Sequence, residues 1–225
     1  MLIYPRGWQA VNWTSDVIRI LLERSTSSYT PDIDHDFLDD FTGGGGVEIS
    51  VASYSRKTLA SMAKAWDATK DQYEYDCADV AFGSLESGQT VKAAIVYRQV
   101  GGDDTTPGND ELILYDDGKV DVVLAANASN GATTVYVQQI EAALANGTAI
   151  DFGGGATATL ASAASRGARS LSISALGAAA TAGAVSANVQ STSILPAVLQ
   201  NGPFSVQIHA DGLITLGMRN KTWTA

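Results

Sequence analysis

The chain has 225 residues, a formal net charge of −10 and only 17% charged residues. Nucleic-acid surfaces need clustered lysine and arginine, so this acidic balance argues against a nucleic-acid partner. The single cysteine, Cys77, excludes an internal disulfide and a cysteine-rich metal site. No apolar run approaches the roughly 20 residues that span a bilayer, so we expect no membrane partner.

The first part of the chain predicts strands and loops around one short helix. Residues 16–23 are apolar at nearly every position, as expected of a strand covered on both faces. Residues 32–41 predict a short helix whose acidic first turn suits the helix dipole. The glycine run 43–46 predicts a turn and not a phosphate-binding loop, because no Lys-Ser/Thr follows it. The alternation in residues 47–51 then predicts a strand.

The middle of the chain predicts a series of antiparallel strands. Segments 59–66 and 73–77 flank turn-forming residues and predict a hairpin. Residues 101–108 are rich in turn formers and predict a loop. Further strands are expected at residues 79–82, 91–98 and 111–117, with 120–124 extending the last of these or pairing with it.

A repeat follows, in which residues 131–140 align with residues 167–176. The offset is 36 residues, and it also matches Gly147 with Gly183. Each copy has apolar side chains two residues apart, the period of a half-buried strand. The pattern predicts a small pseudo-symmetric β module, which contains no histidine or cysteine. The apolar pairs are Val135 with Val137 and Leu171 with Ile173.

The predicted fold is mainly β: an antiparallel β-sandwich host domain with one short helix, interrupted by the pseudo-repeated β module. We assign residues 1–125 and 192–225 to the host domain and 126–191 to the module. The borders of the module are polar and small, as in linkers, so the module is expected to fold independently. The host sheet is predicted to close with a hairpin made of residues 204–209, Asp211, Gly212 and 213–216.

An acidic cluster resembles the opening of a calcium-binding loop in its spacing. Its members are Asp32, Asp34 and Asp36. A calcium loop requires glycine at its sixth position and glutamate at its twelfth, where this chain has Phe37 and Gly43. A solvated helix start is therefore the favoured interpretation, and a bound cation is the alternative. No metal site and no cofactor is predicted.

The two histidines, His35 and His209, lack the sequence surroundings of a catalytic base. The chain has no Gly-x-Ser-x-Gly nucleophile elbow, and nothing selects one carboxylate pair for sugar cleavage. We predict no catalytic residue and no enzymatic activity. Aromatic side chains are the better candidates for binding, either as interface anchors or as a sugar-stacking platform. The predicted interface residues are Tyr4, Trp8, Trp13 and Trp223.

Several segments of the predicted host domain occur in a recognisable order: Trp8, 16–22, 29–31, 35–39, 77–82, 93–97, Asp104 with Thr105, 112–115 and the closing strands. This order resembles a family of small tailed-bacteriophage virion proteins that are encoded among head and neck genes. The resemblance covers roughly residues 1–125 and 195–225, and no single motif carries it. The inserted module is similar to Ala/Thr/Gly-rich β modules that phage structural proteins carry.

The resemblance implies a non-enzymatic virion structural protein, made in the host cytoplasm. Head decoration is the expected role, in which the protein binds the capsid exterior and stabilises the shell. The expected partners are the major capsid protein and further copies of this chain. A trimer is favoured, because capsid lattices present threefold positions. Residues 1–13 have no predicted partner strand and are expected to reach a neighbouring subunit. A tail, neck or fibre protein and a carbohydrate-binding or adhesive module are the alternatives.

Overall fold

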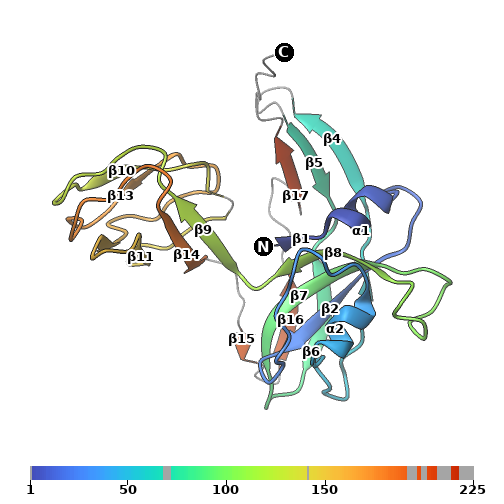
Figure 1. The fold of residues 1–225 in the computed structure, drawn as a ribbon. Helices are drawn as coiled ribbons and strands as arrows, with labels where there is room; N and C mark the ends of the chain where they lie inside the picture. Colours follow the sequence, from blue (N-terminus) through green and yellow to red (C-terminus); the bar gives the residue numbers. More distant parts are fainter. Residues whose placement is uncertain are drawn as a thin grey trace. The chain divides into compact units, whose positions relative to one another are not determined.

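The computed structural model describes residues 2–67, 72–140, 142–191, 197–198, 202–206 and 214–217 (Figure 1). The described chain is mainly β, with antiparallel sheets and two short helices, and this confirms the predicted fold class. It divides into two compact units. We call Asp116–Pro196 the module, and Leu2–Tyr115 together with Ala197–Ala225 the host unit. Neither described helix is long and apolar enough to cross a membrane.

The main sheet of the host unit is built around the antiparallel pairing of β2 (Ile18–Arg24) with β7 (Thr90–Arg98). Ile20, Leu21 and Leu22 are each at most 1% exposed, so both faces of β2 are covered as predicted. The other strands of this sheet are β1 (Leu2–Ile3), β3 (Lys57–Thr58), β8 (Glu111–Asp116) and β15 (Ala197–Val198). The order is β1-β8-β7-β2-β3, and β15 also pairs with β7.

Two smaller sheets belong to the host unit, with the strands β4 (Ala63–Asp67), β5 (Gln72–Asp76), β6 (Val80–Leu85), β16 (Gly202–Val206) and β17 (Ile214–Gly217). The pairing of β4 with β5 confirms the first predicted hairpin. Residues 207–213 of the predicted closing hairpin lie outside the described residues, and the described partners of its two ends are β6 for β16 and β5 for β17. Alternation identifies a strand, but it does not determine which sheet edge that strand joins.

Helix α1 (Pro5–Ala10) is not predicted by the sequence analysis. Its start carries a recognisable signal, because proline at the first helical position fits the helix without losing a hydrogen bond. The helix lies directly against β8. A Cβ atom at Gly7 would overlap the carbonyl oxygen of Leu112, so this approach requires glycine.

Helix α2 (Leu38–Gly43) begins later than the predicted helix 32–41. The preceding residues form turns instead, in which the Asp34 N–H donates to Asp32 Oδ1 over 3.1 Å. Aspartate favours such local turns because its side chain competes with the backbone for hydrogen bonds. The predicted strand at 47–51 is also wrong, since its described pairing to β2 is one isolated bridge, Glu23↔Glu48.

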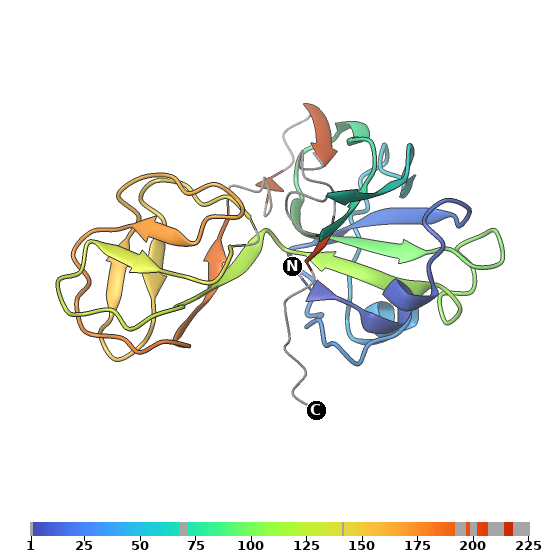
Figure 2. The ribbon, with the colours of Figure 1, turned by 90° about the horizontal axis from the view of Figure 1, so that it is seen from above.

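The module contains the strands β9 (Lys119–Val123), β10 (Thr134–Tyr136), β11 (Ala149–Asp151), β12 (Thr157–Thr159), β13 (Ser170–Ser172) and β14 (Val185–Gln190). The predicted repeat produces a pseudo-twofold arrangement. Strand β10 pairs antiparallel with its own repeat counterpart β13, with Val135 opposite Leu171. Other contacts occur in matched pairs, because the bridge Leu124↔Val137 has the counterpart Leu160↔Ile173. The two halves, yellow and orange in Figure 2, share one apolar interior.

The glycines that match in the repeat form equivalent turns. Gly131 and Gly167 have φ values of 80° and 87°, a left-handed conformation that glycine adopts without strain. The Gly131 N–H donates to the Leu176 carbonyl, and the Gly167 N–H donates to the Ile140 carbonyl, each over 2.8–2.9 Å. The repeat therefore preserves turn geometry as well as apolar periodicity.

Hydrogen bonds link the strands of the module in the order β14-β9-β10-β13-β12-β11. Strand β9 pairs with β14, and β12 pairs with β11. The Ala125 N–H donates to the Tyr136 carbonyl and the Ala161 N–H to the Ser172 carbonyl, which join β9 to β10 and β12 to β13. Figure 1 shows β10 and β13 on one side of the module and β11 and β14 on the other. We call the space between β11 and β14, which share no described ladder pairing, the seam.

The module begins earlier in the chain than predicted. Residues 120–124 were predicted to belong to the host domain, but Val120 and Val122 are buried in the core of the module. The pseudo-twofold arrangement explains this position, because β9 and β14 are the counterparts of β12 and β11. The hairpin turn at residues 152–156 joins β11 to β12, whereas β9 and β14 are the two ends of the module.

Excision of the module tests these boundaries. Replacing residues 117–195 with a short Gly-Ser linker should leave the host unit soluble and folded. Replacing only 126–191 should give aggregation, because β9 would remain without β14 and its buried valines would be exposed. All four tryptophans lie outside the module, so their fluorescence during urea unfolding follows the host unit. Equal solubility of the two variants would contradict the boundary at residue 116.

Candidate functional site

The predicted interface role of Tyr4 is wrong, because Tyr4 is fully buried in the core of the host unit. Its hydroxyl lies 2.9 Å from the Tyr29 hydroxyl. Burial is the largest cause that raises the pKa of Tyr4, and this hydrogen bond is the second. The N-terminal segment also has a partner strand within the chain. Strand β1 pairs with β8, and the Tyr4 N–H donates to the Ile113 carbonyl over 2.9 Å.

The next two predicted residues, Trp8 and Trp13, form an aromatic cluster with Tyr75. The ring centroids of Trp8 and Tyr75 lie 4.5 Å apart in an edge-to-face arrangement, and those of Trp8 and Trp13 lie 5.2 Å apart. Trp13 is buried and Trp8 is half-buried. The cluster therefore packs α1 against β5. It leaves little ring surface for stacking on a sugar. Trp223 lies outside the described residues.

Glu23 lies fully buried in the main sheet, where neighbouring donors satisfy its charge. Lys92 Nζ lies 3.0 Å from Glu23 Oε1, and the Tyr115 hydroxyl donates to Glu23 Oε2 over 2.7 Å. Lys92 also donates to the Tyr29 carbonyl over 2.8 Å. A buried carboxylate in such surroundings holds three parts of the chain together, which is a structural role.

A second network joins the loop after β7 to the main sheet. The carboxylate of Asp104 forms an ion pair with Arg19 and accepts a hydrogen bond from the Tyr97 hydroxyl over 2.8 Å. Arg56 donates to both oxygens of Glu48 with Nε at 3.0 Å and to Oε2 with Nη2 at 2.8 Å. These charged groups bind one another in fixed geometry, which again indicates a structural role.

Asp110, at the end of the same loop, is buried with one carboxylate oxygen unsatisfied. Oδ1 accepts the Val100 N–H over 2.8 Å, whereas Oδ2 has no hydrogen-bond partner among the described residues. Burial raises the pKa of Asp110 above its ordinary value, since desolvation disfavours the charged form. The ionised carboxylate of Asp110 therefore lowers the stability of the folded host unit.

The acidic cluster of the calcium hypothesis is occupied by internal contacts. Asp36 forms an ion pair with Arg6 at 3.3 Å, and the Asp32 carboxylate accepts the Asp34 N–H. Across the part of the chain that the structure describes, no group of three acidic, histidine or cysteine side chains could hold a metal ion. The cation hypothesis gains no support from this geometry.

His35 and Cys77 of the host unit are residue types that can act as a base and as a nucleophile. His35 Nδ1 lies 2.9 Å from the Tyr29 hydroxyl and accepts the Asp32 N–H over 3.3 Å. Cys77 is buried, and burial together with Asp76 and Asp79 raises its pKa to about 11, so the thiol stays protonated at neutral pH. His209 lies outside the described residues.

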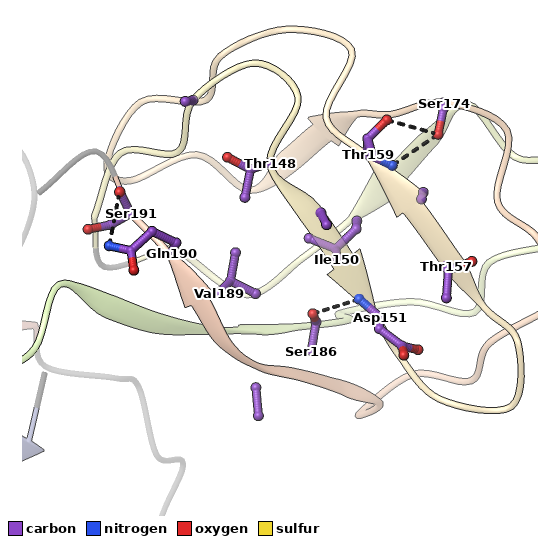
Figure 3. Close-up of a pocket in the computed structure, with 14 residues that line it drawn as sticks. Thr148, Ile150, Asp151, Thr157, Thr159, Ser174, Ser186, Val189, Gln190 and Ser191 are labelled. Carbon is purple, nitrogen blue, oxygen red and sulfur yellow. Dashed lines mark hydrogen bonds between the residues drawn. The ribbon is translucent and has the colours of Figure 1, made fainter. Parts of the chain in front are cut away.

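A groove of about 870 Å³ lies at the seam of the module (Figure 3). The Asp151 N–H crosses the seam and donates to Ser186 Oγ over 2.8 Å. This groove was not predicted from the sequence, although the repeat contained a signal for it. Ser186 is the counterpart of Ile150, so one half of the module has a buried serine where the other has a buried isoleucine. The lining residues with polar side chains are Thr148, Asp151, Thr157, Thr159, Ser174, Ser186, Gln190 and Ser191.

Removing the partner of Glu23 should destabilise the host unit. Lys92→Met leaves a buried carboxylate uncompensated, which costs about 3–5 kcal/mol. Urea unfolding followed by tryptophan fluorescence should show a lower midpoint, and the double variant Glu23→Gln/Lys92→Met should recover part of the loss. Lys57→Met is the matched control, because Lys57 Nζ contacts only an exposed Ser55 hydroxyl at 3.1 Å among the described interactions. Equal midpoints for Lys92→Met and Lys57→Met would contradict the structural role of Glu23.

Neutralising Asp110 should stabilise the host unit at neutral pH. Asp110→Asn keeps the oxygen that accepts the Val100 N–H and removes a buried charge. Because the folded-state pKa is raised, the wild type loses stability as pH rises from about 3.9 through that pKa, whereas asparagine does not titrate. We expect a melting temperature about 2–4 °C higher than wild type at pH 7 and little difference below pH 4. A difference that is independent of pH would contradict this cause.

Comparison with known proteins identifies no relative of this chain. No protein-family model, no curated protein and no solved structure matches it. Its function is therefore inferred from the residues and contacts of the two units.

Proposed function

We propose that this chain is a non-enzymatic structural protein of a tailed-bacteriophage virion that decorates the exterior of the capsid. The observation that carries the proposal is the use of charged groups in the host unit. Glu23, Asp104 and Arg56 are each held in place by other side chains of the same unit. Such pairing suits a rigid binding surface, whereas a catalytic site needs an acid, base or nucleophile free to react.

The mechanism is clamping by a preformed surface. A rigid β unit loses little conformational entropy when it binds, so more of its contact energy stabilises the complex. Contacts with adjacent capsid subunits would raise the free-energy barrier to their separation. The host unit is the part proposed to contact the shell, because it carries the segment order described above.

Self-association is part of the proposal, with a trimer favoured on a threefold position of the capsid lattice. The N-terminal segment no longer supports this assembly, because β1 and Tyr4 are bound within the host unit. Exposed apolar side chains of the host unit provide an alternative contact. Val17, Ile33 and Trp66 are 44%, 55% and 40% exposed.

A tail, neck or fibre position is the alternative within the virion. Copy number separates these positions, because a head protein is present in on the order of hundreds of copies, whereas neck and tail rings have about six or twelve. Quantitative mass spectrometry of purified particles measures this number. A count near six or twelve would reject head decoration and retain a structural role.

Capsid stability provides the direct test. Adding the purified protein to capsids that lack it should raise the temperature at which they release DNA. A variant with residues 117–195 replaced by a linker should give the same increase, because the host unit is proposed to bind the shell. Absence of binding to assembled shells in cosedimentation, with no change in release temperature, would reject the proposal.

A further inference from the structure

The strand order of the module is open at one place, the seam between β11 and β14. Strands β10 and β13 are repeat counterparts and form a regular antiparallel pair. Strands β11 and β14 are also repeat counterparts, but the hydrogen bond from Asp151 N–H to Ser186 Oγ is the described link between them. The seam is thus a place where two strand edges face each other without pairing.

The register of the neighbouring strands shows which backbone groups face the seam. Leu160 N–H donates to the Thr148 carbonyl and Phe152 N–H to the Ala156 carbonyl, so the even-numbered residues of β11 face β12. Alternate residues of an antiparallel strand direct their N–H and C=O to opposite sides. The backbone groups of Ala149 and Asp151 therefore face the seam.

The first residues of β14 alternate in the same way. Leu124 N–H donates to the Ala184 carbonyl, and Ser186 lies opposite Val122 in β9. The backbone groups of Val185 therefore face the seam as well, and the register of β14 shifts between Ser186 and Val189. Both walls of the seam are therefore strand edges, and the Asp151 N–H at one of them is bound to Ser186 Oγ.

The side chains of the groove add hydroxyl groups above an apolar base. Ile150 and Val189 are at most 4% exposed, and Figure 3 shows them between the polar side chains of the two walls. Asp151 is the charged residue among the fourteen that line the groove. One oxygen of its carboxylate accepts the Gly153 N–H over 2.8 Å, which fixes the side chain. A groove without a cationic side chain disfavours phosphate, sulfate and other anions.

We propose that this groove binds a neutral oligosaccharide. A sugar ring has hydroxyl groups that both donate and accept hydrogen bonds, and C–H faces that pack on apolar side chains. The groove has matching strand edges, hydroxyl groups and a carboxylate oxygen of Asp151, and its exposed apolar surface comes from Ala145, Ala149 and Ala187. Its volume lies within the roughly 300–1,000 Å³ of ligand pockets.

An extended peptide is the less suitable ligand. Neighbouring strands lie about 4.8 Å apart, so a strand inserted into the seam would need roughly twice that separation between β11 and β14. The direct contact between Asp151 and Ser186 holds the two strands closer together. A ligand lying over the seam, instead of between its strands, is consistent with this contact.

The test uses the full-length protein with maltotetraose, cellotetraose, chitotetraose and mannotetraose. Titration into ¹⁵N-labelled protein should move the amide signals of Ala149, Asp151 and Ala187 in a saturable manner for at least one tetrasaccharide. The assay is independent of capsid binding, so the failure of one proposal leaves the other intact. Absence of saturable shifts with all four would reject the proposal.

Three variants place the binding site. Ala149→Tyr fills the groove at an exposed position whose repeat counterpart is Val185, and should weaken binding at least about tenfold, a loss of about 1.4 kcal/mol. Asp151→Asn keeps the bond to the Gly153 N–H and should weaken binding without disturbing the hairpin. Tyr136→Ser is the matched control, because Tyr136 is 62% exposed outside the groove and its repeat counterpart is Ser172. Unchanged affinity in both groove variants, or loss of binding in Tyr136→Ser, would overturn the assignment.

Discussion

The antiparallel pairing of the two repeat halves is the contact on which the module depends. Each half contributes strands of mostly three residues, and the apolar side chains of one half are covered by those of the other. Val135 and Leu171 lie opposite each other at the centre of this pairing. Short strands gain little stability alone, so the burial shared by the two halves provides most of the favourable free energy.

The host unit is held together in a different way. Its main sheet buries Glu23 and places charged side chains along strands that are otherwise apolar. Burying a carboxylate costs several kcal/mol unless donors compensate for the lost water. The Lys92 ammonium and the Tyr115 hydroxyl do so, and they come from two further strands of the same sheet. The charge therefore makes the position of these strands specific as well as stable.

The sequence predicts β2, β7, β10 and β13, among others, because their apolar periodicity is local, whereas the short strands β11 and β12 and the strand β14 carry too weak a pattern. Apart from the hairpin of β4 with β5, it does not predict the partners of the strands, because those contacts join distant residues. Glu23 is 69 residues from Lys92 and 92 residues from Tyr115. No local sequence pattern therefore indicates that these residues compensate its charge. The cluster of Trp8, Trp13 and Tyr75 is hidden for the same reason.

The candidate groove was predictable in part. Aligning the repeat halves matches Ser186 with the apolar residue Ile150. This mismatch indicates a polar side chain at a position that the repeat predicts to be buried. That a seam would open there depends on which strand edges remain unpaired, and this follows only from the complete strand order. Apolar periodicity thus predicts strands, and the repeat predicts the symmetry of the module. The groove can be recognised only from the complete strand pairing.

The turn at Gly153, Gly154 and Gly155 occupies the place in one half that the two chain ends occupy in the other. The order in which the chain passes through the module is therefore exchangeable. Opening the chain at this turn and joining β14 to β9 would give a circular permutant with the same contacts. A polypeptide grafted at this turn would enter and leave on adjacent antiparallel strands, as the host unit does at β9 and β14. The module thus has two equivalent positions at which another polypeptide can be joined, and the natural chain uses one of them.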